Sequence, residues 1–159
     1  MGININNFQY VELNQSGISQ EVLQAFDCSN EDMSDYLHNQ AKQDAIAGKC
    51  VTYILITNSK DRIYAYASIS AHGLYYYEDA EKFHTSQSID GKVILSIPSI
   101  ELKMFAISKG LRGQIAFLLD PTYQRHYSTI FFQQLLGDLY YMAMTTIGFQ
   151  MIFLRANNE

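Results

Sequence analysis

The last third of the chain alternates between apolar runs and one long amphipathic segment. An apolar run covers residues 100–108, a polar loop follows, and residues 128–144 carry apolar side chains at helical spacing before a second apolar run at 149–154. This pattern predicts a strand, a helix and a strand. Two parallel strands need a covering crossover, so we expect both runs to be parallel members of one sheet. Ligands of such sheets gather beyond the carboxyl ends of strands, which makes the loop at 108–128 the first place to look for chemistry.

The first fifty residues predict one strand and two helices. An opening strand is expected at 8–13 and a short helix at about 19–26. A second helix is expected to begin with Ser29 as its N-cap and to end at Gly48, because the apolar residues between them recur at helical spacing.

The middle of the chain predicts a hairpin. Two runs at 51–57 and 63–70 are rich in β-branched and aromatic residues, and turn-forming residues lie between them. Residues 73–91 are polar and aromatic without a clear period, so we expect a variable excursion there. A short strand at 93–96 is then expected to precede the central strand that begins near Ile100.

Composition allows one core and excludes several classes of protein. The chain of 159 residues is 48% hydrophobic and 17% charged, which predicts a single domain over 1–159. No apolar run approaches the roughly 18–20 residues that cross a bilayer, and the first ten residues lack the features of a signal peptide. We therefore expect a cytoplasmic protein without a membrane partner. Cys28 and Cys50 have neither metal-site spacing nor the number needed for a disulfide framework, so no metal site is predicted.

The net charge of −5 argues against a broad nucleic-acid surface, because phosphate contacts need clustered Lys and Arg. Nucleic acid is therefore an unlikely partner on the basis of charge. A local basic cluster would suit a small phosphorylated ligand better than a long polyanion. Its members would be Lys103, Lys109, Arg112 and Arg125.

The order of these elements, together with short motifs, resembles the GNAT superfamily of acetyl-CoA-dependent N-acetyltransferases. The opening of the branch that contains the bacterial GNAT toxins is similar to Phe26-Asp27-Cys28, followed by Met33, Tyr36-Leu37 and Ala41. Residues 52–55 and 63–70 are similar to the next two strands of that branch, and 97–107 resemble the segment through its central strand. The similarity covers roughly residues 20–158, and its weight lies in the order of the motifs.

The resemblance implies an α/β (α+β) fold, a mixed twisted sheet flanked by helices. It also implies direct transfer of an acetyl group from acetyl-CoA to a primary amine, with backbone amides polarising the thioester carbonyl. The backbone of Phe105, Ala106 and Ile107 would then bind the pantetheine arm. Their side chains are expected to belong to the sheet core whether or not the backbone binds the coenzyme. Glu101 would be the general base, whereas most Glu residues on a half-exposed strand are simply solvated.

In this family a loop of pattern Q/R-x-x-G-x-G/A at the start of a helix binds the pyrophosphate of coenzyme A through backbone amides. By register, this loop comprises Gln124, Arg125, His126, Tyr127, Ser128 and Thr129. Tyr127 and Thr129 stand in place of the two glycines, so we expect weakened coenzyme binding, and Ser128 is the expected N-cap. A second placement at 112–116 is disfavoured, because Pro121 would interrupt the helix that must follow.

Residues 155–159 resemble the point where the family continues into a further helix and two strands that usually carry a tyrosine acting as general acid. The resemblance therefore implies a GNAT-like domain without its last helix and strands, whether as a truncation, a fragment or a domain completed by another copy. An uncovered strand at 149–154 favours a homodimer that partly buries Phe149, Met151 and Phe153.

Two hypotheses for function follow from this resemblance. The first is an N-acetyltransferase that uses acetyl-CoA and acts on a small-molecule or protein amine. The alternative is a catalytically inactive GNAT-like binding or assembly module, which the missing glycines favour.

Overall fold

The computed structural model describes residues 8–79, 82, 89–117 and 124–155. Within these ranges, one five-stranded sheet has the order β1-β2-β3-β4-β7, and β5 and β6 form a separate hairpin. The strands are β1 (Phe8–Glu12), β2 (Val51–Thr57), β3 (Ile63–Asp79), β4 (Lys92–Ile107), β5 (Ile115–Phe117), β6 (Gln124–His126) and β7 (Met151–Phe153). The helices are η2 (Leu13–Gln15), α1 (Gln20–Gln24), α2 (Glu31–Asp35), η3 (Tyr36–Gln40), α3 (Ala41–Ile46), η5 (Lys109–Leu111) and α4 (Tyr127–Thr145).

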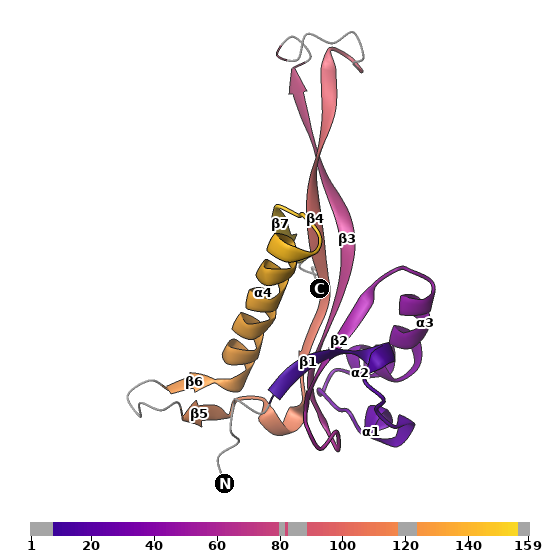
Figure 1. The fold of residues 1–159 in the computed structure, drawn as a ribbon, viewed down its shortest axis with the longest axis vertical. Helices are drawn as coiled ribbons and strands as arrows, with labels where there is room; N and C mark the ends of the chain where they lie inside the picture. The colour runs from indigo at the N-terminus through magenta and orange to yellow at the C-terminus, as the bar shows by residue number, and fades with distance from the viewer. Residues whose placement is uncertain (1–7, 80–81, 83–88, 118–123, 156–159) are drawn as a thin grey trace.

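Helices cover both faces of the sheet (Figure 1). On one face, α4 buries Phe131, Leu135 and Leu139 against the central strands. On the other face, α1, η3 and α3 pack around Tyr66 of β3, and this cluster includes Leu23 among its fully buried residues. The predicted mixed sheet flanked by helices is therefore confirmed. Among the described residues, no helix is long and apolar enough to span a membrane.

The strand–helix–strand unit of the last third is confirmed. Strands β4 and β7 are parallel, and they pair from Ser99–Met151 to Glu101–Phe153. Helix α4 connects them across one face of the sheet (Figure 1). The helix begins one residue before the predicted start, with His126 as the N-cap, so Ser128 lies in the first turn and is not the cap.

The predicted second helix is divided into three segments, and its cap differs from the expectation. Asn30, not Ser29, is the N-cap, because its side-chain oxygen accepts the Met33 backbone N–H at 3.0 Å. Ser29 has a φ of 62° and belongs to the turn before the helix. A π turn over Tyr36–Gln40 interrupts the helix, and the consecutive residues Tyr36 and Leu37 are both buried in the core.

Strands β3 and β4 extend beyond the rest of the sheet as a two-stranded arm (Figure 1). The expectation of an excursion at 73–91 is wrong for 73–79, because ladder pairing continues to Asp79 and Lys92, whereas 80–81 and 83–88 lie outside the described residues. Gly73 has a structural role in the arm. A Cβ at this position would lie 2.7 Å from the Ser96 hydroxyl and 3.2 Å from the Tyr75 ring, so the absence of a side chain leaves room for that ring.

Candidate functional site

Strands β4 and β7 separate directly after they pair at Glu101 and Phe153. Strand β7 ends there, whereas β4 continues to Ile107, and in the described part of the chain no strand pairs with this outer edge of β4. The β3–β4 register also shifts here, which leaves Lys103 as an extra residue in a β-bulge. A bulge bends its strand and disrupts the ladder, so the sheet opens at this point. We call this opening, between residues 102–107 of β4 and the end of β7, the splay.

The open edge of β4 presents the backbone groups of Phe105 and Ile107. Ser108 donates its backbone N–H to the Tyr64 carbonyl of β3 at 2.8 Å. Because backbone groups alternate in direction along a strand, those of Ala106 also face β3, where Ala106 pairs with Tyr66. The backbone groups of Phe105 and Ile107 therefore face the splay, where an extended ligand can reach them.

The side chains of these three residues belong to the core. Phe105 and Ile107 pack toward α4, and the Phe105 ring meets the Phe132 ring edge-on with centroids 5.2 Å apart. Ala106 packs into the cluster under α1–α3. The splay is therefore bounded by the aromatic pair of Phe105 and Phe132 on the side of α4.

Glu101 lies at the splay on the opposite face of the sheet. Its neighbours Ile100 and Leu102 pack under α4, so the Glu101 side chain points to the face that carries α1–α3. The residue is 9% exposed, and its Oε1 atom lies 2.9 Å from the Arg155 Nε atom. This ion pair joins the last residue of the parallel pairing on β4 to the segment that follows β7.

Arg155 also connects Glu101 to a histidine. One of its terminal nitrogens lies 3.4 Å from His72 Nε2, and the His72 ring packs edge-on against Phe153 at 5.2 Å. Glu101 was predicted as a site residue, whereas Arg155 and His72 were not. The position of Arg155 just beyond the carboxyl end of β7 is a signal that could have identified it.

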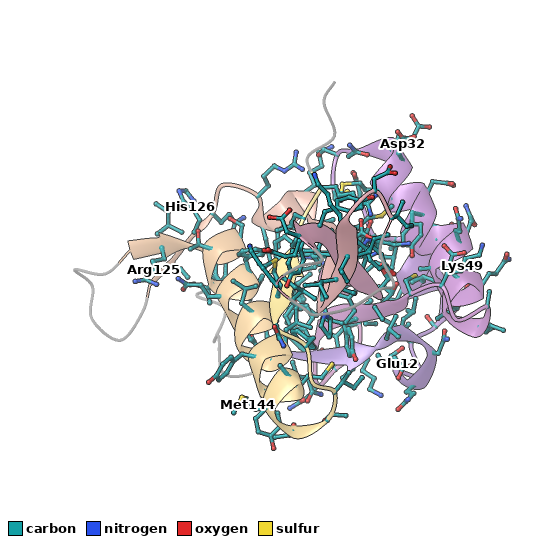
Figure 2. The ribbon with its side chains drawn as sticks, turned by 90° about the horizontal axis from the view of Figure 1, so that it is seen from above. Glu12, Asp32, Lys49, Arg125, His126 and Met144 are labelled. Carbon is teal, nitrogen blue, oxygen red and sulfur yellow. The ribbon has the colours of Figure 1, made fainter. Side chains whose placement is uncertain are left out.

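The residues predicted to bind pyrophosphate surround the start of α4, but they differ in exposure. The Gln124 backbone belongs to β6, and Ser128 is half-buried in the first helical turn. Arg125, His126 and Thr129 are exposed. Arg125 and His126 lie at the side of α4 that is far from the α1–α3 layer (Figure 2). The Arg125 guanidinium donates to the Gln133 side-chain oxygen at 2.9 Å.

Tyr127, which stands in place of the first glycine, is a core residue. It is 5% exposed, and its ring packs against Phe131 with centroids 5.7 Å apart. Its backbone N–H donates to the Gln114 carbonyl at 3.2 Å, so this amide already has a hydrogen-bond acceptor within the protein. The free amides of the first turn are therefore those that follow Tyr127.

The second placement of the loop, at 112–116, does not match the structure. Ile115–Phe117 form strand β5, which pairs with β6, and no helix starts there. Arg112 instead donates to the Cys28 carbonyl at 2.7 Å, and the Lys109 backbone N–H donates to the Asp27 carbonyl at 2.7 Å. This loop therefore anchors Asp27 and Cys28. Pro121 lies outside the described residues.

No protein-family model matches the chain, and a search of curated proteins finds no match. Solved structures with the same fold do match. A mutant of the toxin AtaT has a TM-score of 0.65 and 19% identity, with 100% of this chain and 78% of that chain covered. AtaTR bound with AcCoA has a TM-score of 0.69 at 18% identity, with 98% and 80% covered. A mutant of KacT has a TM-score of 0.61 at 16% identity, with 96% and 80% covered. The chain therefore has the GNAT fold of these toxins.

Further structures of this fold overturn the partners expected from the sequence. AtaT is known complexed with acetyl-methionyl-tRNAfMet and bound to the C-terminus of the antitoxin AtaR, and KacTA is known in a complex with DNA. The expectation of a small-molecule or protein amine acceptor, with nucleic acid unlikely, is therefore wrong. It rested on the net charge of the whole chain, which does not describe the potential of one local surface.

Proposed function

We propose that the protein is an N-acetyltransferase that uses acetyl-CoA and whose acceptor amine is carried by an aminoacyl-tRNA. The observation that carries the proposal is the splay, with backbone groups of Phe105 and Ile107 on its open edge and the Glu101 carboxylate at its apex. Neighbours of the same fold support both substrates, since one is bound with AcCoA and another is complexed with acetyl-methionyl-tRNAfMet. Both substrates occur in the cytoplasm, so the proposal includes a cytoplasmic location.

The chemistry assigns a role to each part of the splay. Acetyl-CoA supplies an activated acetyl thioester, and the open edge of β4 binds its extended pantetheine arm through backbone groups of Phe105 and Ile107. The amine nitrogen forms a bond to the acetyl carbon, the carbon–sulfur bond breaks, and coenzyme A leaves as the thiolate. Glu101 accepts the proton that the amine loses. The ion pair with Arg155 at 2.9 Å holds the Glu101 carboxylate in place.

The acceptor is tested with radiolabelled acetyl-CoA and three candidate acceptors, namely methionyl-tRNA, deacylated tRNA and free methionine. We expect label on methionyl-tRNA alone, with a rate that falls as salt rises, because phosphate contacts release counterions. Equal transfer to free methionine would contradict the tRNA acceptor. Binding of acetyl-CoA without transfer to any of the three would favour the alternative, an inactive GNAT-like module.

That alternative rests on one specific observation. The buried side chain of Tyr127 and the Cβ of Thr129 occupy the positions where glycines would let a pyrophosphate approach the helix. A binding module would tolerate this arrangement better than an enzyme that must hold its co-substrate in one position.

Replacing Thr129 with glycine is expected to raise the affinity for acetyl-CoA about threefold to tenfold, because the backbone opens to the pyrophosphate. Thr129 is exposed, so the change should cost about 1 kcal/mol or less of stability. Isothermal calorimetry measures the affinity. Thr146→Gly, just after the other end of α4, is the matched control. Tyr127→Gly is unsuitable because it removes a buried ring. An affinity that stays unchanged in Thr129→Gly would show that the proposed loop register is wrong.

The homodimer remains a prediction. Strand β7 is at the edge of the sheet, and Met151 is 41% exposed, whereas Phe149 and Phe153 are half-buried by the chain itself. Light scattering at tens of micromolar measures the mass. We expect the mass of two chains and, for Met151→Lys, the mass of one, because a charge at this edge opposes pairing. A single-chain mass for the unmodified protein would rule out the dimer.

A further inference from the structure

A cavity separate from the splay lies between α4 and strands β1 and β2. Its volume is about 280 Å³. Its lining includes Tyr10 of β1, Tyr53 of β2, and Leu135, Asp138, Leu139 and Met142 of α4. Asp138 and Met142 are four residues apart and share one flank of the helix, whereas Phe132 packs on Phe105 of β4. The cavity is therefore separate from the splay.

The Asp138 carboxylate has no counter-ion. Within the described part of the chain, no hydrogen bond or ion pair reaches its side chain, and no Lys, Arg or His lines the cavity. Asp138 is exposed at the rim of the cavity, and the protein that surrounds the rest of its carboxylate removes enough water to raise its pKa. A carboxylate in this position gains from a cation that enters the cavity.

Two neutral aromatic rings stand beside this carboxylate. The Tyr10 hydroxyl donates to the Phe131 carbonyl at 3.2 Å, and burial, with a further contribution from Asp138, raises its pKa. Burial also raises the pKa of Tyr53, with a further contribution from Glu12, its partner across the β1–β2 ladder. Both phenols therefore stay neutral at physiological pH. One carboxylate, that of Asp138, thus lies in a small cavity with aromatic walls.

We propose that this cavity binds a small organic cation, an alkylammonium group. The ammonium would lie between the Asp138 carboxylate and the rings of Tyr10 and Tyr53, which attract cations through their faces. Its alkyl chain would pack on the apolar residues Leu135, Leu139 and Met142. A divalent metal ion fits less well, because it requires several oxygen ligands and the cavity offers one carboxylate. A neutral ligand would gain nothing from the charge of Asp138.

The test is a titration of the full chain, followed by NMR, with n-butylammonium and with 1-butanol, its uncharged analogue of similar shape. We expect butylammonium to bind at least about tenfold more tightly, since only the cation gains the charge and ring contacts. Equal binding of 1-butanol, or displacement of butylammonium by an equal concentration of Mg²⁺, would overturn the proposal. The titration needs no acetyl-CoA, so its outcome is independent of the proposed transferase activity.

Variants locate the site. Asp138→Asn keeps the size of the side chain and is expected to lower the butylammonium affinity about tenfold, and Tyr53→Leu to lower it severalfold. Asp32→Asn, on the opposite helical layer, is the control and should change nothing (Figure 2). A thermal melt confirms that each variant is folded. Unchanged affinity in a folded Asp138→Asn protein would refute the site. In the unmodified protein, binding should weaken as the pH falls through the raised pKa of Asp138. The titratable groups that line the cavity with it are Tyr10 and Tyr53, and Glu12 acts on Tyr53.

Discussion

Replacing Glu101 with glutamine is expected to lower kcat for acetyl transfer about 10²–10⁴-fold, the usual contribution of a general base. Glutamine keeps the shape of the side chain and an oxygen that accepts from Arg155, which lies 2.9 Å from the carboxylate in the structure. It cannot accept the proton of the amine. We therefore expect a loss in kcat with little change in the affinity for acetyl-CoA, because in the proposed complex the coenzyme binds along the open edge of β4 and not at this side chain.

The pH profile separates a catalytic role from a structural one. If Glu101 is the base, the acidic limb of kcat/KM should disappear in Glu101→Gln, whereas a structural role would leave the shape of the profile unchanged. Glu31→Gln, at the exposed start of α2, is the matched control. Full activity of Glu101→Gln with methionyl-tRNA would exclude Glu101 as the base and direct attention to His72, the other titratable group beside Arg155.

Replacing Phe131 with alanine is expected to lower the free energy of unfolding by about 3–5 kcal/mol, the usual cost of removing a buried aromatic ring. Phe131 is fully buried, and its ring lies 5.2 Å from that of Phe8 and 5.7 Å from that of Tyr127. The Phe131 ring therefore packs α4 against β1, and it also supports Tyr127 in the first turn of α4. Urea denaturation measures the loss.

Tyr140→Ala is the control for this prediction, because Tyr140 lies on the same helix and is 67% exposed. Its change in stability should stay within about 0.5 kcal/mol, as for most surface substitutions. If Phe131→Ala costs no more than Tyr140→Ala, then α4 does not pack on the sheet as described.

The regular elements could be predicted from sequence where one face is buried and the other is exposed. The helix expected at 128–144 is Tyr127–Thr145, and the strand expected at 51–57 is Val51–Thr57. A short strand was expected at 93–96, but the extension of β3 and its pairing with β4 as an arm were missed for a physical reason. Neither face of this ribbon is fully buried, so its residues carry no period of two, and Gly73 and Pro98 suggest interruptions that the paired strands accommodate.

The candidate site was predictable only in part. The resemblance to the GNAT superfamily implied Glu101 and the edge at 105–107, but a bulge at Lys103 depends on the pairing of two strands and has no local signal. The buried position of Tyr127 was also hidden, because a sequence does not tell whether a residue in the first turn of a helix faces the sheet. The cavity beside Asp138 needs β1, β2 and α4 together, and these elements are far apart in the chain.

The parallel pairing of β4 with β7 determines the order in which the site forms. The β3–β4 hairpin joins neighbours in sequence, and such contacts form in microseconds. Glu101 must instead meet Phe153 and Arg155 across more than fifty residues, and only after α4 has crossed the sheet, which is a slow closure. We expect Glu101 to gain its ion pair in one of the last steps of folding. The same three-residue pairing would be among the first parts to open under stress, so the Glu101–Arg155 ion pair would be lost before the core unfolds.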